Sequence, residues 1–576
     1  MYKSILINHY NTPENIKEVV SPENIIEFDY SNSEHTNIDE YISNSIISKL
    51  ENKKFDIIYI KDNLSSNYLE LYGLRVAYHI RLSQKLGHQK QYVPIVILSD
   101  MDGYTLNKLE PMAKIVFTKN IFLESNAVTT IDKYNKKLNE KDIEQLTKNE
   151  FSNKFLELIT IEPPENSSSH SIANEWAIYK WSKELKLPQS DIIKVIAKLE
   201  SQLYFKYLKA QNNIEDTIEN KKTTFNYTKP NKDLVHFFAN KSKILYIDDE
   251  WDKGWKDIFD FYFSSNLVQF KTLNDVIFLN HKYADIENEI IEKVFEYRPD
   301  LIILDMRLVQ DDHNERIKPE DISGIKLLNK IKSTSADTQL NPGIQIIMLS
   351  ASGRSDILEE ANKNNKILGY IKKDHIDDKT SDTNENILKL KAFLKDGEQK
   401  FYLKKIWEIQ SDILLRIKDR ESLKEIGIEI SIFQILNSNI ENPYNFTIFT
   451  FTKCLEAISS LYINEHAMKY LDDHSDVGVY DYDKNAVYDY DGEKWYKGTE
   501  NRLHNILYEK LELKNNLAHK ELCELINCRN YLAHPNERQP HGCDLIKNPN
   551  YSEIIKWFDL LNKIISQIVA IRYANS

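Results

Sequence analysis

Cysteine is scarce in this chain. The 576 residues contain four, Cys454, Cys523, Cys528 and Cys543, and all lie in the last quarter. So few thiols cannot form a disulfide framework for a chain of this length, and they favour a reducing, cytoplasmic setting. Their spacing, with His541 between them, matches no familiar zinc finger, so we expect free thiols.

The chain also lacks a net positive charge and long apolar runs. The net charge is -13 at pH 7, so no overall field attracts nucleic acid, and any RNA contact must be local. Because no basic recognition helix is evident, we expect no DNA-binding output. No run approaches the roughly 20 apolar residues of a membrane span. The first residues also lack the pattern of a signal peptide, so we expect no membrane partner.

The length predicts several domains, and the most informative stretch is 243–374. Four short apolar runs lie in it, KILYIDDE, PDLIILDMRL, IQIIMLSAS and LGYIKKD, each followed by a helical pattern. This alternation predicts a parallel sheet covered by helices. In such sheets the functional residues lie at the carboxyl ends of the strands. These ends carry Asp248, Asp249, Asp305, Ser350 and Lys373.

The five residues form a chemical set. Three carboxylates brought together repel one another and need a cation, and oxygen ligands of this kind suit Mg²⁺. A carboxylate can act as nucleophile toward a phosphoryl group, and a lysine and a hydroxyl nearby would hold the phosphoryl oxygens.

With these residues, the stretch resembles the receiver domain of two-component response regulators. The resemblance implies a doubly wound, flavodoxin-like domain over 239–396 that binds Mg²⁺ and takes phosphate from a histidine kinase or small phosphodonor. By position, Asp305 resembles the phospho-acceptor, and Asp248 and Asp249 resemble the acidic pair that binds the metal with it. Ser350 resembles the switch hydroxyl and Lys373 the invariant lysine.

One departure from the family pattern is the loop from Asp305 to Gly324, which is longer than the usual turn. This insertion could gate access to Asp305 or replace part of the partner surface. The alternative is a receiver fold that no longer takes phosphate. The presence of all five pocket residues favours phosphorylation.

Residues 1–125 repeat the pattern in degraded form, as SILINHY, FDIIYIKDNL, VPIVILSD and KIVFTKN. We interpret this as an internal duplication that gives a second flavodoxin-like fold, a pseudo-receiver that packs, dimerises or senses. The alternative is an unrelated α/β domain. Asn8 and His9 replace the acidic pair, Lys61 replaces the acceptor, and Ser99 and Lys119 are the retained hydroxyl and lysine. By strand alternation, the neighbouring Asp62 would point to the other face, so it is a poor substitute acceptor.

Residues 126–238 predict a helical spacer. The segments IANEWAIYKWSKEL and QSDIIKVIAKLESQLYFKYLKA carry apolar residues at helical spacing. Their aromatic residues, Trp176, Trp181, Tyr204 and Tyr207, could resemble a base-stacking set. We expect them instead to form core or an interdomain contact.

Residues 397–576 predict an all-helical domain interrupted by one tyrosine-rich hairpin, VGVYDYDKNAVYDYDGEKWYKG. A calcium loop is disfavoured there, because Ala486 stands where the turn glycine should be.

The motif CRNYLAHP, with Arg529, Asn530 and His534, resembles the R-N-x-x-x-H motif of HEPN domains, helical bundles found in many RNA-cutting proteins. The resemblance implies a metal-independent endoribonuclease without cofactor, whose cleft forms between two protomers. Arg529 would stabilise the phosphate, His534 would move a proton and Asn530 would orient the pair. Pro535 turns His534 out of the helix, toward a shared cleft. Alternatively, Arg529 caps carbonyls and His534 is a cation at a helix end.

Together these features predict a multidomain α/β and all-α protein: two receiver-type folds, a helical spacer and a HEPN-like bundle. The hypothesis is that phosphorylation of Asp305 controls RNA cleavage by a homodimer, with stress or phage defence implied by the family. The alternative is a non-catalytic adaptor whose helical domain binds a partner or dimerises.

Overall fold

A computed structural model gives the fold. It describes residues 3–10, 12, 14–35, 37–67, 69–140, 143, 146–164, 169–187, 191–212, 231–276, 278, 281–314, 316–333, 340–350, 359–361, 366–374, 382–418, 420, 423, 445, 447–458, 479–481, 486–488, 494–497, 519–533 and 551–573. Within these ranges no helix has the length and apolar character to cross a membrane. The chain divides into two compact units. One comprises residues 1–233, 252–261 and 374–384, and the other residues 234–251, 262–373 and 385–576.

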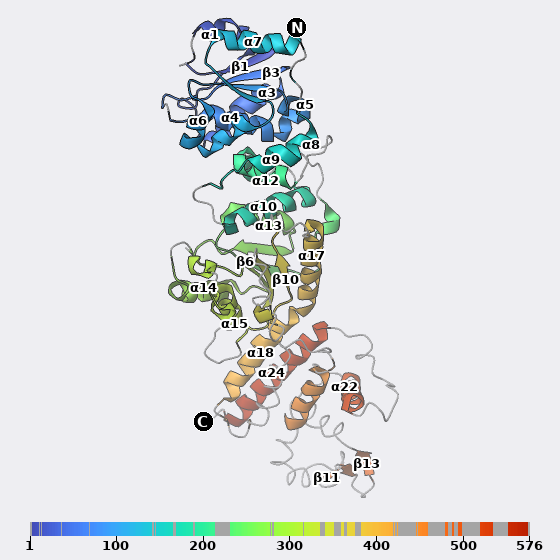
Figure 1. Cartoon of the computed structure of the whole chain (residues 1–576). Helices are drawn as coiled ribbons and strands as arrows, with labels where there is room; N and C mark the ends of the chain where they lie inside the picture. Colours follow the sequence, from blue (N-terminus) through green and yellow to red (C-terminus); the bar gives the residue numbers. More distant parts are fainter. Residues whose placement is uncertain are drawn as a thin grey trace. The chain divides into compact units, whose positions relative to one another are not determined.

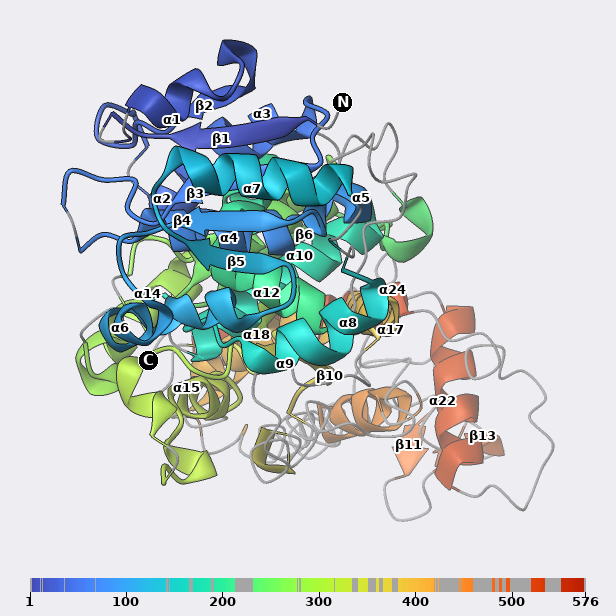
Figure 2. The same ribbon diagram turned by 45° about the horizontal axis from the view of Figure 1, so that its top comes forward.

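The N-terminal unit contains a five-stranded parallel sheet in the order β2-β1-β3-β4-β5. Its strands are β1 (Ser4–Asn8), β2 (Ile25–Glu27), β3 (Ile57–Lys61), β4 (Ile95–Leu98) and β5 (Ile121–Glu124). The central strands are apolar throughout because both faces of the sheet are covered. On one face, α1 (Glu14–Glu18) and α7 (Val128–Asn139) pack over Leu6, Tyr59 and Val96 (Figure 2).

The opposite face is covered by a second group of helices. They are α2 (Ile38–Tyr41), which continues through the π-helical turn Ile42–Ile47 into α3 (Ser48–Glu51), α4 (Tyr72–Leu82) and α5 (Gly87–Gln91). The apolar side chains of α2, α3, α4 and the π-helical turn pack on Ile5, Ile58 and Ile97. Alternate strand residues therefore supply two separate cores, as strand geometry requires.

The last strand of this sheet differs from the prediction. The segment KIVFTKN was expected to be a strand, but η4 (Pro111–Phe117) is a 3-10 helix that follows α6 (Gly103–Leu109). Glu110 caps η4 by accepting from the backbone N–H of Met112, and Pro111 occupies the first turn, where its missing N–H costs nothing. The strand is the next apolar run, IFLE, which forms β5.

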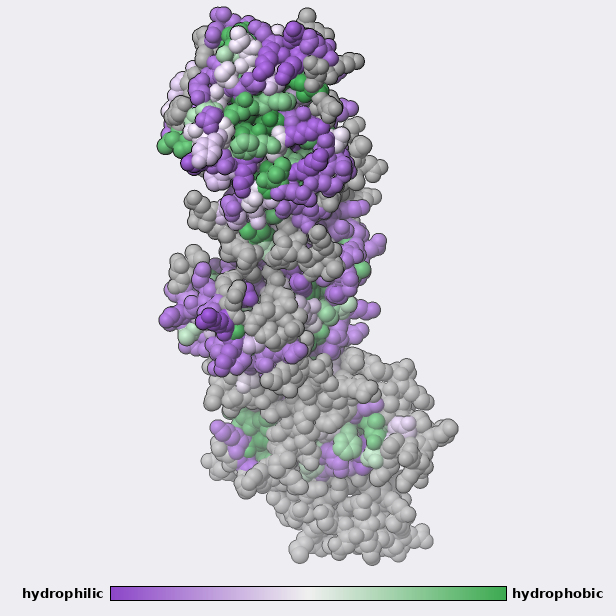
Figure 3. Space-filling view, viewed as in Figure 1, coloured by the Kyte–Doolittle hydropathy of each residue, from purple (hydrophilic) through white to green (hydrophobic). Residues whose placement is uncertain are grey.

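The described residues of the predicted spacer, 126–238, are mainly helical, but its first helix, α7, packs on the first sheet and so belongs to that fold. The rest of the spacer contains α8 (Lys148–Glu150), the π-helical turn Phe151–Phe155, α9 (Leu156–Leu158), α10 (Ser169–Leu185), α11 (Asp191–Ser201) and α12 (Leu203–Gln211) (Figure 1). Leu203 and Tyr207 of α12 join the core of the first sheet. Trp176 and Trp181 of α10 are buried, which confirms that these rings are core. The face of the N-terminal unit in Figure 3 is mainly hydrophilic with apolar patches. The exposed large side chains of this unit include Tyr104 and Phe117.

The second unit contains another five-stranded parallel sheet, in the order β10-β9-β8-β6-β7. The strands are β6 (Ser242–Ile247), β7 (Val268–Thr272), β8 (Leu301–Leu304), β9 (Gln345–Ser350) and β10 (Gly369–Lys372). Its helices include α14 (Tyr283–Tyr297), α15 (Ser323–Ile331) and α17 (Thr383–Lys400). In both sheets the first strand along the chain lies between the second and the third, and the fourth and fifth follow the third. This shared order agrees with an internal duplication.

The C-terminal region is mainly helical. α18 (Tyr402–Ile417) packs along α24 (Tyr551–Tyr573) (Figure 1). A helix over 447–458 and α22 (His519–Ala533) complete a core that includes Ile413, Phe451, Leu525 and Phe558. The tyrosine-rich segment forms the antiparallel strands β11 (Val479–Asp481), β12 (Ala486–Tyr488) and β13 (Lys494–Lys497). The predicted hairpin is therefore present, with a third strand.

Candidate functional site

The five predicted pocket residues of the second sheet lie at one edge of it. Asp248 and Asp249 follow β6, Asp305 follows β8, Ser350 ends β9 and Lys373 follows β10. All but Asp249 are fully buried. The parallel register aligns these strand ends, so residues far apart in the sequence meet at the same place.

The three carboxylates form a compact cluster with one lysine. Oxygen atoms of Asp248, Asp249 and Asp305 all lie within 4.8 Å of one another. The Lys373 ammonium donates to Asp248 Oδ2 at 2.9 Å and to Asp305 Oδ2 at 3.4 Å. The other oxygen of Asp305 accepts from the backbone N–H of Met306 at 2.7 Å. The lysine thus bridges the central carboxylates.

One ammonium group cannot neutralise three carboxylates, two of them fully buried. Burial and the neighbouring charge of Asp248 raise the pKa of Asp249 to about 8. Burial also raises the pKa of Asp305 to about 7, although the Lys373 ammonium acts against it. The buried Oδ1 of Asp249 has no hydrogen-bond partner among the described residues. An all-oxygen site with excess negative charge and an unused ligand atom fits a hard divalent cation such as Mg²⁺. Asp248, Asp249 and Asp305 would hold it.

Two tyrosines at this edge were not singled out from the sequence. The Tyr246 hydroxyl donates to Asp248 Oδ2, and the Tyr370 hydroxyl donates to the carbonyl of Ser350 at 3.2 Å. Tyr246 lies two residues before Asp248 on β6, and strand alternation puts such residues on the same face. That spacing was a signal in the sequence.

The long loop after Asp305 is packed structure. It contains the short 3-10 helices Gln310–His313 and Pro319–Asp321. The buried carboxylate of Asp312 accepts from the backbone N–H groups of Leu308, Val309 and Ser323 at 3.0, 3.3 and 3.1 Å, and from the Ser323 hydroxyl. Asp312 therefore ties the insertion to the first residue of α15. The sequence showed an insertion but not this anchor.

The equivalent edge of the N-terminal sheet has different chemistry. Asn8 ends β1, and its amide donates to Glu27 Oε2 at 2.6 Å. Lys61 ends β3, at the position of Asp305 in the second sheet. Asp62 was expected to point to the other face from Lys61. It continues the alternate positions Ile58 and Ile60, and its buried carboxylate accepts from the Ser99 hydroxyl at 2.6 Å.

Lys119 does not take the place of Lys373. Its ammonium instead donates to Glu150 Oε1 at 2.8 Å. In the second sheet Ser350 pairs with Lys372, and Lys373 follows. In the first sheet Leu98 pairs with Glu124, so Ser99 aligns with Ser125 and the following residue is Asn126. Asn126 therefore stands at the position where Lys119 was expected, because the fifth strand is Ile121–Glu124 and not KIVFTKN.

Comparison with known families agrees with this loss. A family model described as the inactive receiver domain matches residues 11–124. The N-terminal fold is a degenerate receiver domain. No curated protein matches the chain. The degenerate receiver retains the sheet and Ser99, but it has Asn8, His9 and Lys61 at the positions of Asp248, Asp249 and Asp305 in the second sheet.

The C-terminal motif is described in part. Arg529 and Asn530 lie on α22, while His534 lies outside the described residues, as do His541 and Cys543. The Arg529 guanidinium forms an ion pair with Glu456 of the helix over 447–458, and each side chain is 14% exposed. This ion pair engages Nη2, one of the three guanidinium nitrogens. Cys454 and Cys528 are buried and are not in a disulfide, which agrees with the prediction of reduced thiols.

Proposed function

We propose that the second receiver-like fold accepts a phosphoryl group on Asp305 and thereby regulates the C-terminal helices. The carboxylate cluster bridged by Lys373 is the observation that carries the proposal. Mg²⁺, when bound, would neutralise the carboxylates and the incoming phosphoryl oxygens. A carboxylate oxygen of Asp305 attacks the phosphorus, and the bond to the leaving group of a phosphohistidine or acyl phosphate breaks. Lys373 and Ser350 then hold the phosphoryl oxygens.

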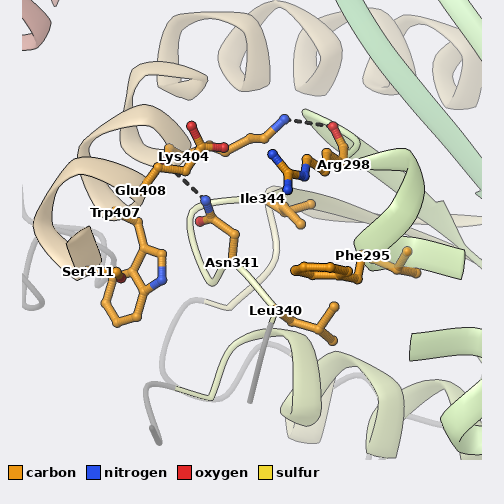
Figure 4. A pocket seen from close by; sticks show the side chains of 10 residues that line it. Phe295, Arg298, Leu340, Asn341, Ile344, Lys404, Trp407, Glu408 and Ser411 are labelled. Atoms are coloured by element: carbon orange, nitrogen blue, oxygen red, sulfur yellow. Dashed lines mark hydrogen bonds between the residues drawn. The ribbon is translucent and has the colours of Figure 1, made fainter. Parts of the chain in front are cut away.

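The helix α18 contacts both the receiver-like fold and the C-terminal helices of the second unit, which supports this regulation. The Lys404 ammonium of α18 donates to the carbonyl of Arg298 and to Asp300 Oδ1, both at 2.7 Å. Asn341 donates its amide to the Lys404 carbonyl at 2.9 Å (Figure 4). The same helix packs its apolar face on α24. α18 is therefore clamped to the base of the receiver-like fold and is also core of the helical region.

The clamp leaves space beside it. A pocket of about 350 Å³ lies between α14 and α18, with Phe295, Leu340 and Trp407 among its walls (Figure 4). An open volume next to a polar clamp lets a helix shift without a steric clash on that side. We infer that a change in the receiver-like fold reaches the helical region through α18.

The output we propose is RNA cleavage by Arg529, Asn530 and His534 in a homodimer. The motif and its place on a helix of the C-terminal core support it. Arg529 pairs with Glu456, so a phosphate would compete with or share this guanidinium, and phosphorylation of Asp305 would bias that competition. The alternative output is a non-catalytic adaptor.

The phospho-acceptor proposal is tested on the full-length protein with acetyl phosphate and Mg²⁺. We expect acid-labile phosphate on the wild-type protein and on the control Asp311→Asn, which changes an exposed carboxylate of the same loop. Asp305→Asn should take up none. The proposal would be refuted if Asp305→Asn were labelled as strongly as the wild-type protein, or if neither the wild-type protein nor Asp311→Asn were labelled.

The nuclease proposal is tested by digesting total RNA with the full-length protein, with and without acetyl phosphate, and mapping the ends. We expect 2′,3′-cyclic phosphate and 5′-hydroxyl ends, lost in Arg529→Ala and His534→Ala. Arg416→Ala, in the same helical region and paired with Asp412, should still cleave. Cleavage that is unchanged in the first two variants would leave the adaptor as the output.

A further inference from the structure

Two stretches of chain leave the acidic pocket of the second sheet and join the N-terminal unit. After Asp249 the chain passes through the 3-10 turn Trp251–Lys253 into α13 (Trp255–Tyr262), and directly after Lys373 comes Asp374. Residues 252–261 and 374–384 group with the spacer helices and not with the sheet. The spacer therefore contacts chain that is continuous with both sides of the pocket.

The contact with α13 is close and aromatic. The rings of Trp181 and Trp255 meet edge to face, with centroids 5.3 Å apart, and both side chains are fully buried. The Trp255 indole N–H donates to Asn174 Oδ1 at 3.3 Å. Gly254 has a φ of +123°, and a Cβ there would lie 3.2 Å from Ile178 of α10. Glycine is needed at this position for both its backbone conformation and its close approach to the helix.

The contact with Asp374 is polar and buried. Its carboxylate has no exposed surface, accepts from the indole N–H of Trp181 at 3.1 Å and lies 3.8 Å from the Lys180 ammonium. A buried carboxylate that loses such partners is strongly destabilised, so Asp374 stays where α10 presents its donor. The preceding residue is Lys373, whose backbone N–H donates to the backbone carbonyl of Ser350 at 2.8 Å. The position of α10 thus constrains the chain that carries the pocket lysine.

We propose that Trp181 and Lys180 are positioning residues for the site around Asp305. Through these two residues, α10 responds to phosphorylation of Asp305. This inference rests on the function proposed for Asp305. A phosphoryl group on Asp305 gives the Lys373 ammonium new anionic partners, and a shift of the Lys373 backbone toward them would carry Asp374 with it. Because the partners of Asp374 lie on α10, the shift reaches the unit that contains the degenerate receiver.

The test compares two tryptophan variants of the full-length protein. Trp181→Phe keeps an aromatic ring but removes the donor to Asp374. Trp176→Phe is the matched control, because Trp176 is buried in the same helix and packs on Phe205 at 5.7 Å. Loss of one hydrogen bond to a charged group predicts phosphorylation by acetyl phosphate about tenfold slower in Trp181→Phe than in the control. Equal rates in the two variants would overturn the proposal.

A second measurement does not require phosphate. Hydrogen exchange at the Lys373 amide, followed by mass spectrometry without a phosphodonor, should be faster in Trp181→Phe than in Trp176→Phe. If the wild-type protein takes no phosphate but this difference appears, the proposed function fails and the positioning role stands. If the exchange rates are equal, the positioning role is refuted whatever happens at Asp305.

Discussion

Replacing Asp39 with asparagine should release α12 from the degenerate receiver. Asp39 lies on α2 and accepts from Arg75 Nη2 and His79 Nε2 of α4, both at 2.9 Å, and from the backbone N–H of Leu203 at 2.8 Å. The Lys206 ammonium on α12 completes the network with a 2.8 Å bond to His79 Nδ1. One carboxylate therefore connects two helices of the receiver to the spacer.

The magnitude follows from the charges that would be left behind. Burial alone would raise the pKa of Asp39, but its partners His79 and Arg75 hold it well below the usual range. Burial, and then the Lys206 ammonium, lower the pKa of His79 to about 3, so His79 is neutral at pH 7. The charges facing Asp39 are then those of Arg75 and Lys206. Breaking a buried ion pair from one side costs about 3–5 kcal/mol.

The lower end of that range applies here. Burial lowers the pKa of Lys206 to about 7, so the lysine can lose its proton when Asp39 is removed, and the expected cost is about 3 kcal/mol. Hydrogen exchange of α12 in the full-length protein measures it, and the amides should exchange roughly a hundredfold faster in Asp39→Asn. Asp132→Asn changes an exposed carboxylate on α7 and should exchange as the wild-type protein does. Unchanged protection of α12 in Asp39→Asn would refute this account of the network.

Three further outcomes are expected. Between pH 6.5 and about 4, His79 is protonated in the unfolded chain but not in the folded chain. The free energy of unfolding of the N-terminal unit should therefore fall, as the pH falls, by up to about 1.4 kcal/mol per pH unit. Urea unfolding should show a smaller pH dependence in His79→Gln. Asp312→Ala removes the anchor of the long loop; limited proteolysis should cut that loop in this variant but not in Asp311→Ala, and resistance of both would contradict the anchor role. Gly343→Ala would place a Cβ 2.6 Å from the Lys404 Cα, so thermal unfolding should show a loss of about 1–3 kcal/mol. In Gly103→Ala the Cβ comes no closer than 3.3 Å to any atom, that atom belonging to the Phe117 ring, so this variant should cost less.

The sequence alone predicted most of the pocket, for a physical reason. Runs such as LIIL and IIMLS are apolar throughout because both faces of a parallel sheet are covered, so they identify central strands without any knowledge of their neighbours. Once the strands are assigned, parallel pairing places Asp248, Asp305 and Ser350 at one edge. Their meeting point depends only on local strand assignment.

The same reasoning failed where a local pattern fits two structures. KIVFTKN is apolar enough for a strand, but Glu110 and Pro111 begin a 3-10 helix there, and the error moved the expected lysine to Lys119. Short apolar runs do not distinguish strand from helix by themselves.

Only the tertiary structure revealed the partners of Asp374, Asp39 and Lys404. The Trp181–Asp374 bond joins residues 193 positions apart, and Lys206 and His79 are 127 apart. No periodicity connects such residues, because their contact depends on how whole helices pack against the two sheets. Local apolar patterns fixed which strands form and what chemistry their ends carry, whereas helix packing decided which buried charges are paired and how the pocket is held.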